Sequence, residues 1–396
     1  MPPAYLLSPC RTPGARRNGR LSGWHPVDLA AQVIDAVVDR SGADPARVDD
    51  VILGCVMQVG EQAVNVARNA VLASRTLPQT VPGTSIDRQC GSSQQALHFA
   101  AQAVMSGTMD LVIAGGVESM SRVPLGASVQ LAAKAGMGHY MSGDIKAKYG
   151  DADFSQFTGA EMLAAKFGLS REALDAYALE SHRRAAAATA AGHFADELLP
   201  VPVRTADGQG EGLHTADEGI RADASLAALA ALKPLRGEGS GGVITAGNAS
   251  QICDGASAVL VASERAVRDL NVAPLARIHH LSVLGGDPVI MLDAPIAATE
   301  AALRKAGLRL ADIDLFEVNE AFASVPLAWL EATGADPAKL NVHGGAIALG
   351  HPLGASGTKL LATLVHALRR RRGRYGLLTM CEGGGMANVT IVEALY

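Results

Sequence analysis

The stretch TSIDRQCGSSQQAL, from Thr84 to Leu97, places a cysteine between a short extended segment and the first turn of a helix. A thiol at a helix N-terminus lies near unpaired backbone N–H groups and the positive end of the helix dipole, which lower its pKa from roughly 8.5. Gly91, directly after it, lets a substrate approach the backbone closely. Cys90 is therefore a candidate nucleophile, although a lone cysteine beside small residues is also typical of an inert buried side chain.

The segments around this stretch alternate between strand-like and helix-like patterns, which predicts an α/β fold. DDVILGCVMQ and MDLVIAGGV are short apolar runs rich in β-branched residues, and residues 92–107 between them carry apolar side chains at helical spacing. The same order recurs near the C-terminus, where DIDLFEVNEAFASV, GASGTKLLATLVHALRR and YGLLTMCEGGG indicate a strand leading to a helix, a helix and a strand. This recurrence predicts an internal duplication.

Residues 121–242, between the two halves, are polar and rich in glycine, except for one helical segment that Ser170 opens as an N-cap. So long an insertion is typical of a functional lid. At 396 residues the chain is too long for one ordinary core, which favours two domains or two similar halves.

Charge and cysteine usage exclude several classes of protein. Lys and Arg total 34 against 39 for Asp and Glu, so the net charge of −5 gives no reason to expect a nucleic-acid partner. The arginine run at 369–372 is interpreted as the last turn of a helix, where cations offset the dipole.

Five cysteines without paired spacing argue against a disulfide framework or a zinc site and for a reducing compartment. No apolar run reaches the roughly 18 residues of a membrane span, and the first residues lack the apolar core of a secretory signal. We therefore expect a cytoplasmic enzyme.

Three further polar residues lie in glycine-rich loops or just before a helix. NVHGGAIALGHPLGASG places His351 just before a helix, TMCEGGG places Cys381 at a strand end, and VNEAFAS places Asn319 at a strand-to-helix junction. Each has an ordinary structural explanation, as a hydrogen-bonded histidine, a tight turn and an N-cap respectively. Together with Cys90 they predict a site for nucleophilic catalysis.

In this order, the motifs GGVESMS, TAGNAS, NEAFA, GHPLGASG and CEGGG resemble those of the thiolase family, the acyl-CoA:acetyl-CoA acyltransferases. The resemblance extends nearly from end to end, beginning at RTPGARRNGRLS. It implies the thiolase fold, with two similar halves in a five-layer α-β-α-β-α arrangement and an inserted loop domain. We expect an N-terminal half at residues 1–120 plus 250–270, a loop domain at 121–249 and a C-terminal half at 271–396.

The resemblance also implies a role for each matching position. Cys90 would carry the acyl group as a thioester, His351 would accept its proton, and Cys381 would serve as the second base and acid. The backbone N–H groups of Cys90 and Gly383 would stabilise the oxyanion on the acyl-enzyme carbonyl. Asn319, through a bound water, and His351 would stabilise the enolate-like oxygen of the second thioester.

Coenzyme A (CoA) would be a substrate of such an enzyme, with no tightly bound cofactor and no metal, and would lie along the loop domain. The matching positions are Ser250 and Ala246 at the pantetheine, Ala321, Phe322 and Met291 at the thioester pocket, and Arg221 at the nucleotide end. Ala228 stands where the family has an adenine-side serine, which leaves the nucleotide contacts open. Because the family assembles as dimers or pairs of dimers, we expect a homodimer or a homotetramer.

Two departures bear on the substrate. Members that act on acetoacetyl-CoA carry His-Met-Gly where this chain has residues 155–157, Ser-Gln-Phe, and many members have Met-Gly-x-Gly-Pro where it has MLDAP at 291–295. Both lie where the acyl tail would go, so the chain resembles degradative 3-ketoacyl-CoA thiolases, including those that accept steroid side chains. The alternatives are a short-chain acetoacetyl-CoA thiolase working in the condensing direction, a cysteine acyl-CoA hydrolase and a non-catalytic binding protein. A ketoacyl synthase fits less well, because the second base position is Cys381.

Overall fold

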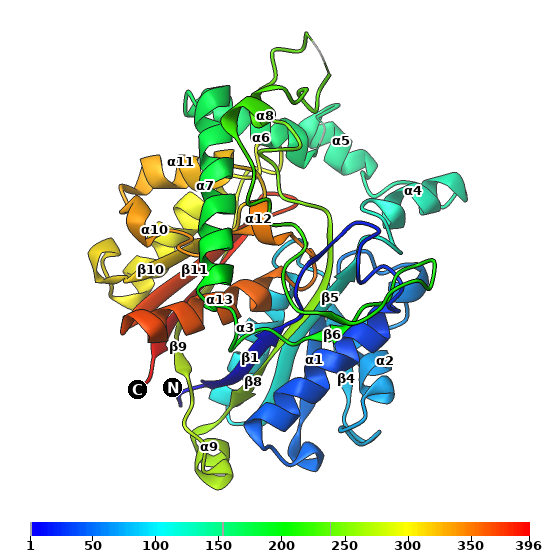
Figure 1. Cartoon of the computed structure of the whole chain (residues 1–396), viewed down its shortest axis with the longest axis vertical. Helices are drawn as coiled ribbons and strands as arrows, with labels where there is room; N and C mark the ends of the chain where they lie inside the picture. Colours follow the sequence, from blue (N-terminus) through cyan, green and yellow to red (C-terminus); the bar gives the residue numbers. More distant parts are fainter. Residues whose placement is uncertain (1, 153, 238) are drawn as a thin grey trace.

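A computed structural model describes residues 2–152, 154–237 and 239–396 (Figure 1). Its main feature is a ten-stranded mixed sheet in the order β10-β11-β12-β9-β1-β8-β5-β3-β4, with β2 beside β8. The strands of this sheet are β1 (Tyr5–Arg11), β2 (Ala15–Arg16), β3 (Asp50–Gly54), β4 (Gly83–Ile86), β5 (Leu111–Ser119), β8 (Cys253–Ala262), β9 (Ala276–Gly285), β10 (Leu315–Val318), β11 (Tyr375–Glu382) and β12 (Met386–Ala394). A separate small sheet pairs β6 (Val201–Pro202) with β7 (Leu213–His214).

The two halves of the main sheet have corresponding topologies. In the N-terminal half β3 pairs with β5 in parallel and β5 pairs with β8 in antiparallel, and β10, β11 and β12 repeat this pattern in the C-terminal half. A helix precedes the middle strand in both cases, namely α3 (Ser92–Met105) before β5 and α13 (Ser356–Arg371) before β11. The predicted duplication is thus confirmed. The halves meet edge to edge, because β1 also pairs with β9.

Three hydrophobic clusters divide the molecule into five layers. Helices α1 (Pro26–Ser41) and α2 (Val66–Ala73) cover the outer face of the N-terminal half-sheet. Helices α10 (Ala294–Ala306) and α11 (Ser324–Thr333) cover the outer face of the C-terminal half-sheet. Between the two half-sheets lie α3 and α13, and Figure 1 shows the layers in this order. The predicted α-β-α-β-α arrangement is therefore confirmed.

Side chains alternate strictly along the inner strands. On β3, Val51 and Leu53 join the cluster with α1, whereas Ile52 joins the cluster with α3. On β11, Leu377 joins the cluster with α10 and its neighbour Leu378 the cluster with α13. Both faces of these strands are covered, which explains why they are continuous apolar runs in the sequence.

The region between β5 and β8 contains more helix than the sequence indicates. Helix α7 (Arg171–Ala190) begins after Ser170, whose hydroxyl accepts a hydrogen bond from the Ala173 N–H, as predicted. Four further helices went unpredicted, because their polar and glycine-rich sequences carry little periodicity: α4 (Ala127–Lys134), α5 (Gly143–Tyr149), α6 (Gln156–Lys166) and α8 (Leu226–Ala230). The three-part division given above stays a prediction; positions 1, 153 and 238 of those ranges lie outside the described residues.

The remaining helices lie at connections. Helix α9 (Glu264–Leu270) links β8 to β9, and the single turn α12 (Ala346–Leu349) precedes His351. Helix α13 ends as predicted, with arginines 369–371 in its last turn and Arg372 as a left-handed C-cap. Across the described ranges, no helix is long and apolar enough to cross a membrane.

Candidate active site

Cys90 lies at the junction between the loop after β4 and the start of α3, where Gly91 is the N-cap. This placement agrees with the sequence, but the predicted lowering of the Cys90 pKa is wrong. Burial raises the pKa of the thiol to about 12, and the nearby carboxyl of Glu382 raises it further. Desolvation and negative charge outweigh the helix N-terminus, so the resting side chain is a thiol.

His351 is held in the tautomer whose Nε2 can act as the base. Its Nδ1 lies 2.6 Å from the Ser356 hydroxyl, which gives its own hydrogen to the Pro352 carbonyl at 2.8 Å. Nδ1–H is therefore the donor to Ser356, and the lone pair lies on Nε2, 3.3 Å from the Asn319 Nδ2. Burial, with a smaller contribution from the cation of Lys359, lowers the pKa of His351 to about 3, so the ring is neutral at pH 7.

The loop that carries His351 is fixed by buried polar contacts. The Lys359 ammonium donates to the carbonyls of Leu349 and Gly350, at 2.5 and 2.9 Å, and the His351 N–H donates to the Gln251 carbonyl at 3.1 Å. Gly350 has φ +80°, and a Cβ there would lie 2.5 Å from the Cys253 sulfur, so only glycine fits. Gly350 is thus required for the backbone conformation of the loop that carries His351.

Asn319 is not a helix cap, because α11 begins only at Ser324. Its backbone N–H donates to the Thr379 carbonyl on β11 at 3.0 Å, which brings the ends of β10 and β11 together. Its amide nitrogen faces His351, whereas its buried Oδ1 has no partner within the described part of the chain. A buried unpaired amide oxygen is a ready acceptor for a bound water.

Cys381 and Gly383 lie where β11 turns into β12. Burial raises the pKa of Cys381 well above its usual range, and the neighbouring Cys90 and Glu382 add to this effect. The effect of Cys90 on Cys381 indicates that the two thiols lie near each other. The Gly383 N–H makes no hydrogen bond within the described residues, which leaves it available to an oxyanion. Gly384 and Gly385 have φ of +82° and +77°, so the turn itself also requires glycine.

A cavity of about 440 Å³ lies beside His351, lined by residues of the region between β5 and β8 and by residues of both halves. Five of the predicted residues line it: Arg221, Ala246, Ser250, Phe322 and His351. Cys90 packs against a hydrophobic cluster that includes Met120 and Leu353, and both of these residues line the cavity. Six predicted residues do not line it: Cys90, Met291, Asn319, Ala321, Cys381 and Gly383. Of these, Met291 and Ala321 are buried, and the Ala321 carbonyl accepts a hydrogen bond from the Ser250 N–H at 2.9 Å.

The wall of this cavity has a basic side and an aromatic side. Arg16, Arg17 and Arg221 supply positive charge, which suits an anionic ligand. Phe157 on α6 meets Phe322 edge to face, with the ring centroids 5.7 Å apart, and both rings line the cavity. The residues at 156–157 singled out in the sequence are thus part of the cavity wall.

Comparison with known proteins gives the family. The family model described as "Thiolase, N-terminal domain" matches residues 4–265, and "Thiolase, C-terminal domain" matches residues 272–394. The chain belongs to the thiolase family. It is therefore an acyltransferase, as the motifs implied.

Its relatives match along their whole length. A steroid 3-ketoacyl-CoA thiolase of Mycobacterium tuberculosis is 52% identical over 400 residues, covering 100% of this chain and 95% of the relative. A 3-ketoacyl-CoA thiolase of Bacillus subtilis is 39% identical, covering 99% of this chain and 100% of the relative. Human mitochondrial 3-ketoacyl-CoA thiolase in complex with CoA has a TM-score of 0.88 at 38% identity, covering 100% of this chain and 98% of that chain. Bacillus anthracis acetyl-CoA acetyltransferase has a TM-score of 0.90 at 35% identity, covering 100% and 99%.

Two buried carboxyl groups of this thiolase organise the site, and the sequence analysis assigned neither of them a role. Glu118, within GGVESMS, accepts hydrogen bonds from the backbone N–H groups of Val56, Met57 and Gly354 and from the Gln62 amide. It thereby ties the histidine loop to the loop after β3. The only signal in the sequence is a charged residue inside an otherwise apolar strand.

The second carboxyl, Glu320, lies within NEAFA and joins α7 to the C-terminal half. It accepts hydrogen bonds from Tyr177 and Ser181 on α7, from the Asn341 amide and from the Ile347 N–H. Its four donors come from two distant parts of the chain, α7 and residues 341–347, which no local pattern reveals.

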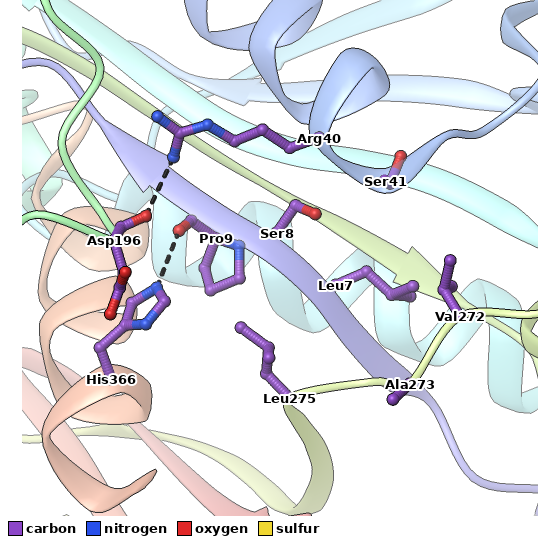
Figure 2. Close-up of a pocket in the computed structure, with 10 residues that line it drawn as sticks. All are labelled: Leu7, Ser8, Pro9, Arg40, Ser41, Asp196, Val272, Ala273, Leu275 and His366. Atoms are coloured by element: carbon purple, nitrogen blue, oxygen red, sulfur yellow. Dashed lines mark hydrogen bonds between the residues drawn. The ribbon is translucent and has the colours of Figure 1, made fainter. Parts of the chain in front are cut away.

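A second cavity, of about 270 Å³, lies between β1, the end of α1 and α13 (Figure 2). Two of its polar side chains are already engaged, since Arg40 donates to the Asp196 carbonyl at 3.0 Å and His366 lies 3.4 Å from the Pro9 carbonyl. None of the predicted catalytic residues lines it. The chemistry of this thiolase is accordingly assigned to the first cavity.

Proposed function

We propose that this thiolase is a degradative 3-ketoacyl-CoA thiolase, which cleaves 3-ketoacyl-CoA with CoA into acetyl-CoA and a shortened acyl-CoA. One observation carries the proposal: a neutral histidine, whose Nε2 faces the Asn319 amide, lines a cavity with basic residues in its wall, and Cys90 lies near enough to Cys381 to raise the pKa of that thiol. The similarity to relatives that are named 3-ketoacyl-CoA thiolases supports it.

The first half-reaction begins with the proton of Cys90 moving to the Nε2 of His351. The thiolate attacks the 3-keto carbon, the C2–C3 bond breaks, and the acyl group stays on Cys90 as a thioester. The electron pair released at C2 takes up the proton of Cys381, and acetyl-CoA leaves. Since the resting pKa values of thiol and histidine lie far apart, the proton moves only as substrate oxyanions are stabilised by the Gly383 N–H and by Asn319 with His351.

The second half-reaction restores the enzyme. The Cys381 thiolate takes the proton of the incoming CoA thiol, and the CoA thiolate attacks the thioester on Cys90. The bond from carbonyl carbon to Cys90 sulfur breaks, and Cys90 recovers its proton from His351. CoA is a substrate in this scheme, held by Ser250 and Ala246 near the pantetheine and by Arg221 at the nucleotide end.

We propose that the acyl chain is longer than acetoacetyl, because Phe157, in a segment where short-chain members differ in sequence, pairs with Phe322 to form an apolar part of the cavity wall. The alternative is a short-chain acetoacetyl-CoA thiolase, favoured by the similarity to an acetyl-CoA acetyltransferase. The ratio of kcat/KM on acetoacetyl-CoA to that on longer 3-ketoacyl-CoAs separates the two. A much higher value on acetoacetyl-CoA would contradict the proposal.

We further propose a homodimer or homotetramer in the cytoplasm, on the usual assembly of the family and on the free state of all five cysteines. Light scattering at micromolar concentration tests the assembly, and a monomer would contradict it.

A further inference from the structure

Glu382, the residue after Cys381, is a buried carboxyl without a conventional role. It is 0% exposed, and neither of its side-chain oxygens has a hydrogen-bond partner within the described residues. Burying an unpaired carboxylate is very costly, so such a group either becomes protonated or serves a purpose. The two other carboxyls beside the site, those of Glu118 and Glu320, are by contrast surrounded by donors.

The carboxyl of Glu382 occupies the space that a side chain at position 91 would fill. A Cβ on Gly91 would overlap the Glu382 Oε1, so the acid reaches the backbone between Cys90 and α3. Gly91 is thus needed for this contact, in addition to any approach of substrate. Because of this contact, the Glu382 carboxyl lies beside Cys90, while the Glu382 backbone directly follows Cys381.

Few charged groups surround this carboxyl. Arg88, on the loop before Cys90, is the nearby cation, and its Nη1 lies 3.5 Å from the sulfur of Met386 on β12. From β12 the backbone N–H of Asn388 also favours the charged form, although it does not meet the geometry of a hydrogen bond. The other carboxyls that act on Cys90 are Asp87 and Glu118. Compensation for a negative charge on Glu382 is therefore weak.

We propose that Glu382 controls the ionisation of both thiols: as a neutral acid it permits the thiolates of Cys90 and Cys381, and as a carboxylate it suppresses them. This rests on the proposed function only in that the thiols are taken as the reactive groups. Glu382 acts through the thiols and is a positioning residue rather than a catalytic one.

The electrostatics agree with this geometry. Burial raises the pKa of Glu382 to about 8, and Arg88 opposes this only in part. Glu382 in turn raises the pKa of Cys90 and of Cys381. Below pH 8 the acid is mostly neutral and adds little repulsion, whereas above pH 8 each thiolate would form next to a carboxylate.

The test is the rate of Cys90 alkylation by iodoacetamide between pH 6.5 and 9.5, followed by peptide mass spectrometry on the full-length, substrate-free protein. We compare the parent with Glu382→Gln, and with Glu317→Gln as a matched control. Glu317 is also a buried carboxyl, but the charges that act on it are Glu320, Glu197 and Arg184. Glu382→Leu serves as a second neutral variant.

We expect Glu382→Gln and Glu382→Leu to match the parent below pH 7 and to react about tenfold faster at pH 9.5, since one pKa unit is a tenfold change. Glu317→Gln should follow the parent throughout. In the parent itself, the logarithm of the rate should rise with a slope below one near pH 8. A variant-to-parent ratio that is constant with pH, or a straight parent line of unit slope, would overturn the inference. Absence of thiolase activity would refute the proposed function without affecting this measurement.

Discussion

Replacing Ser356 with alanine is expected to lower kcat without changing KM. The hydroxyl of Ser356 is the hydrogen-bond acceptor for the Nδ1–H of His351, and so keeps the lone pair on Nε2. Without it, the buried Nδ1–H loses its partner, and the tautomer with Nε2 protonated, which cannot act as the base, becomes more populated. KM should hold because Ser356 does not line the cavity.

The magnitude follows from the burial of this contact. Ser356 is 2% exposed and lies 2.6 Å from the ring nitrogen, so water cannot replace it easily. A buried donor left without a partner costs about 1–3 kcal/mol. If this cost falls on the transition state, kcat drops by about 5- to 150-fold.

The assay is steady-state cleavage of a 3-ketoacyl-CoA with CoA, with Ser356→Thr and Ser257→Ala alongside. The threonine variant keeps a hydroxyl beside the ring and should retain most of the activity. Ser257 is also buried, and its hydroxyl donates to the Ala355 carbonyl at 2.7 Å, so its variant perturbs the same helix start without touching His351. A kcat of Ser356→Ala within twofold of the parent, or an equal loss in Ser257→Ala, would refute the reasoning.

Four further outcomes are expected. Cys381→Ala should lose roughly a hundredfold or more in cleavage, as for a general acid–base, and a smaller loss by the same assay would argue against its role. Phe157→Ala, which removes one ring of the edge-to-face pair, should lower kcat/KM for long acyl chains more than for acetoacetyl-CoA; equal losses would indicate a structural effect. Arg11→Met should lower the free energy of unfolding in urea by about 3–5 kcal/mol, because it leaves Asp217 and Glu197 buried without their cation. As a control, Arg265→Met removes a surface ion pair with Asp110 and should cost under about 1 kcal/mol. Glu382→Gln should gain stability over the parent as pH rises toward 8, by up to several kcal/mol, because the folded parent binds a proton there that the unfolded chain has released; a pH-independent difference would contradict this.

The sequence predicts where the candidate catalytic residues lie in the fold better than it predicts their pKa values. Cys90 before α3, His351 before α13 and Cys381 at the end of β11 follow from local spacing of apolar residues and glycine. The pKa of Cys90 was predicted in the wrong direction, because burial and the approach of Glu382 depend on packing between the two halves.

Two buried carboxyl groups and four helices could not be predicted from the sequence for the same reason, since they depend on contacts between distant segments. Glu118 and Glu320 collect donors from segments far apart in the chain, and their partners become apparent only once the halves are folded together. The helices α4, α5, α6 and α8 lie in polar, glycine-rich sequence, where tertiary contacts rather than periodicity decide the structure. The fold family, by contrast, followed from motifs in a fixed order.

The most direct test of the central claim is CoA-dependent cleavage of 3-ketoacyl-CoAs from four to sixteen carbons by the purified parent protein, beside Cys90→Ala and Cys381→Ala. The account predicts activity that rises with chain length, requires CoA and is abolished or severely reduced in both variants. Free acid released without CoA would make the protein a hydrolase, and complete inactivity of the parent on every chain length would contradict a catalytic role altogether.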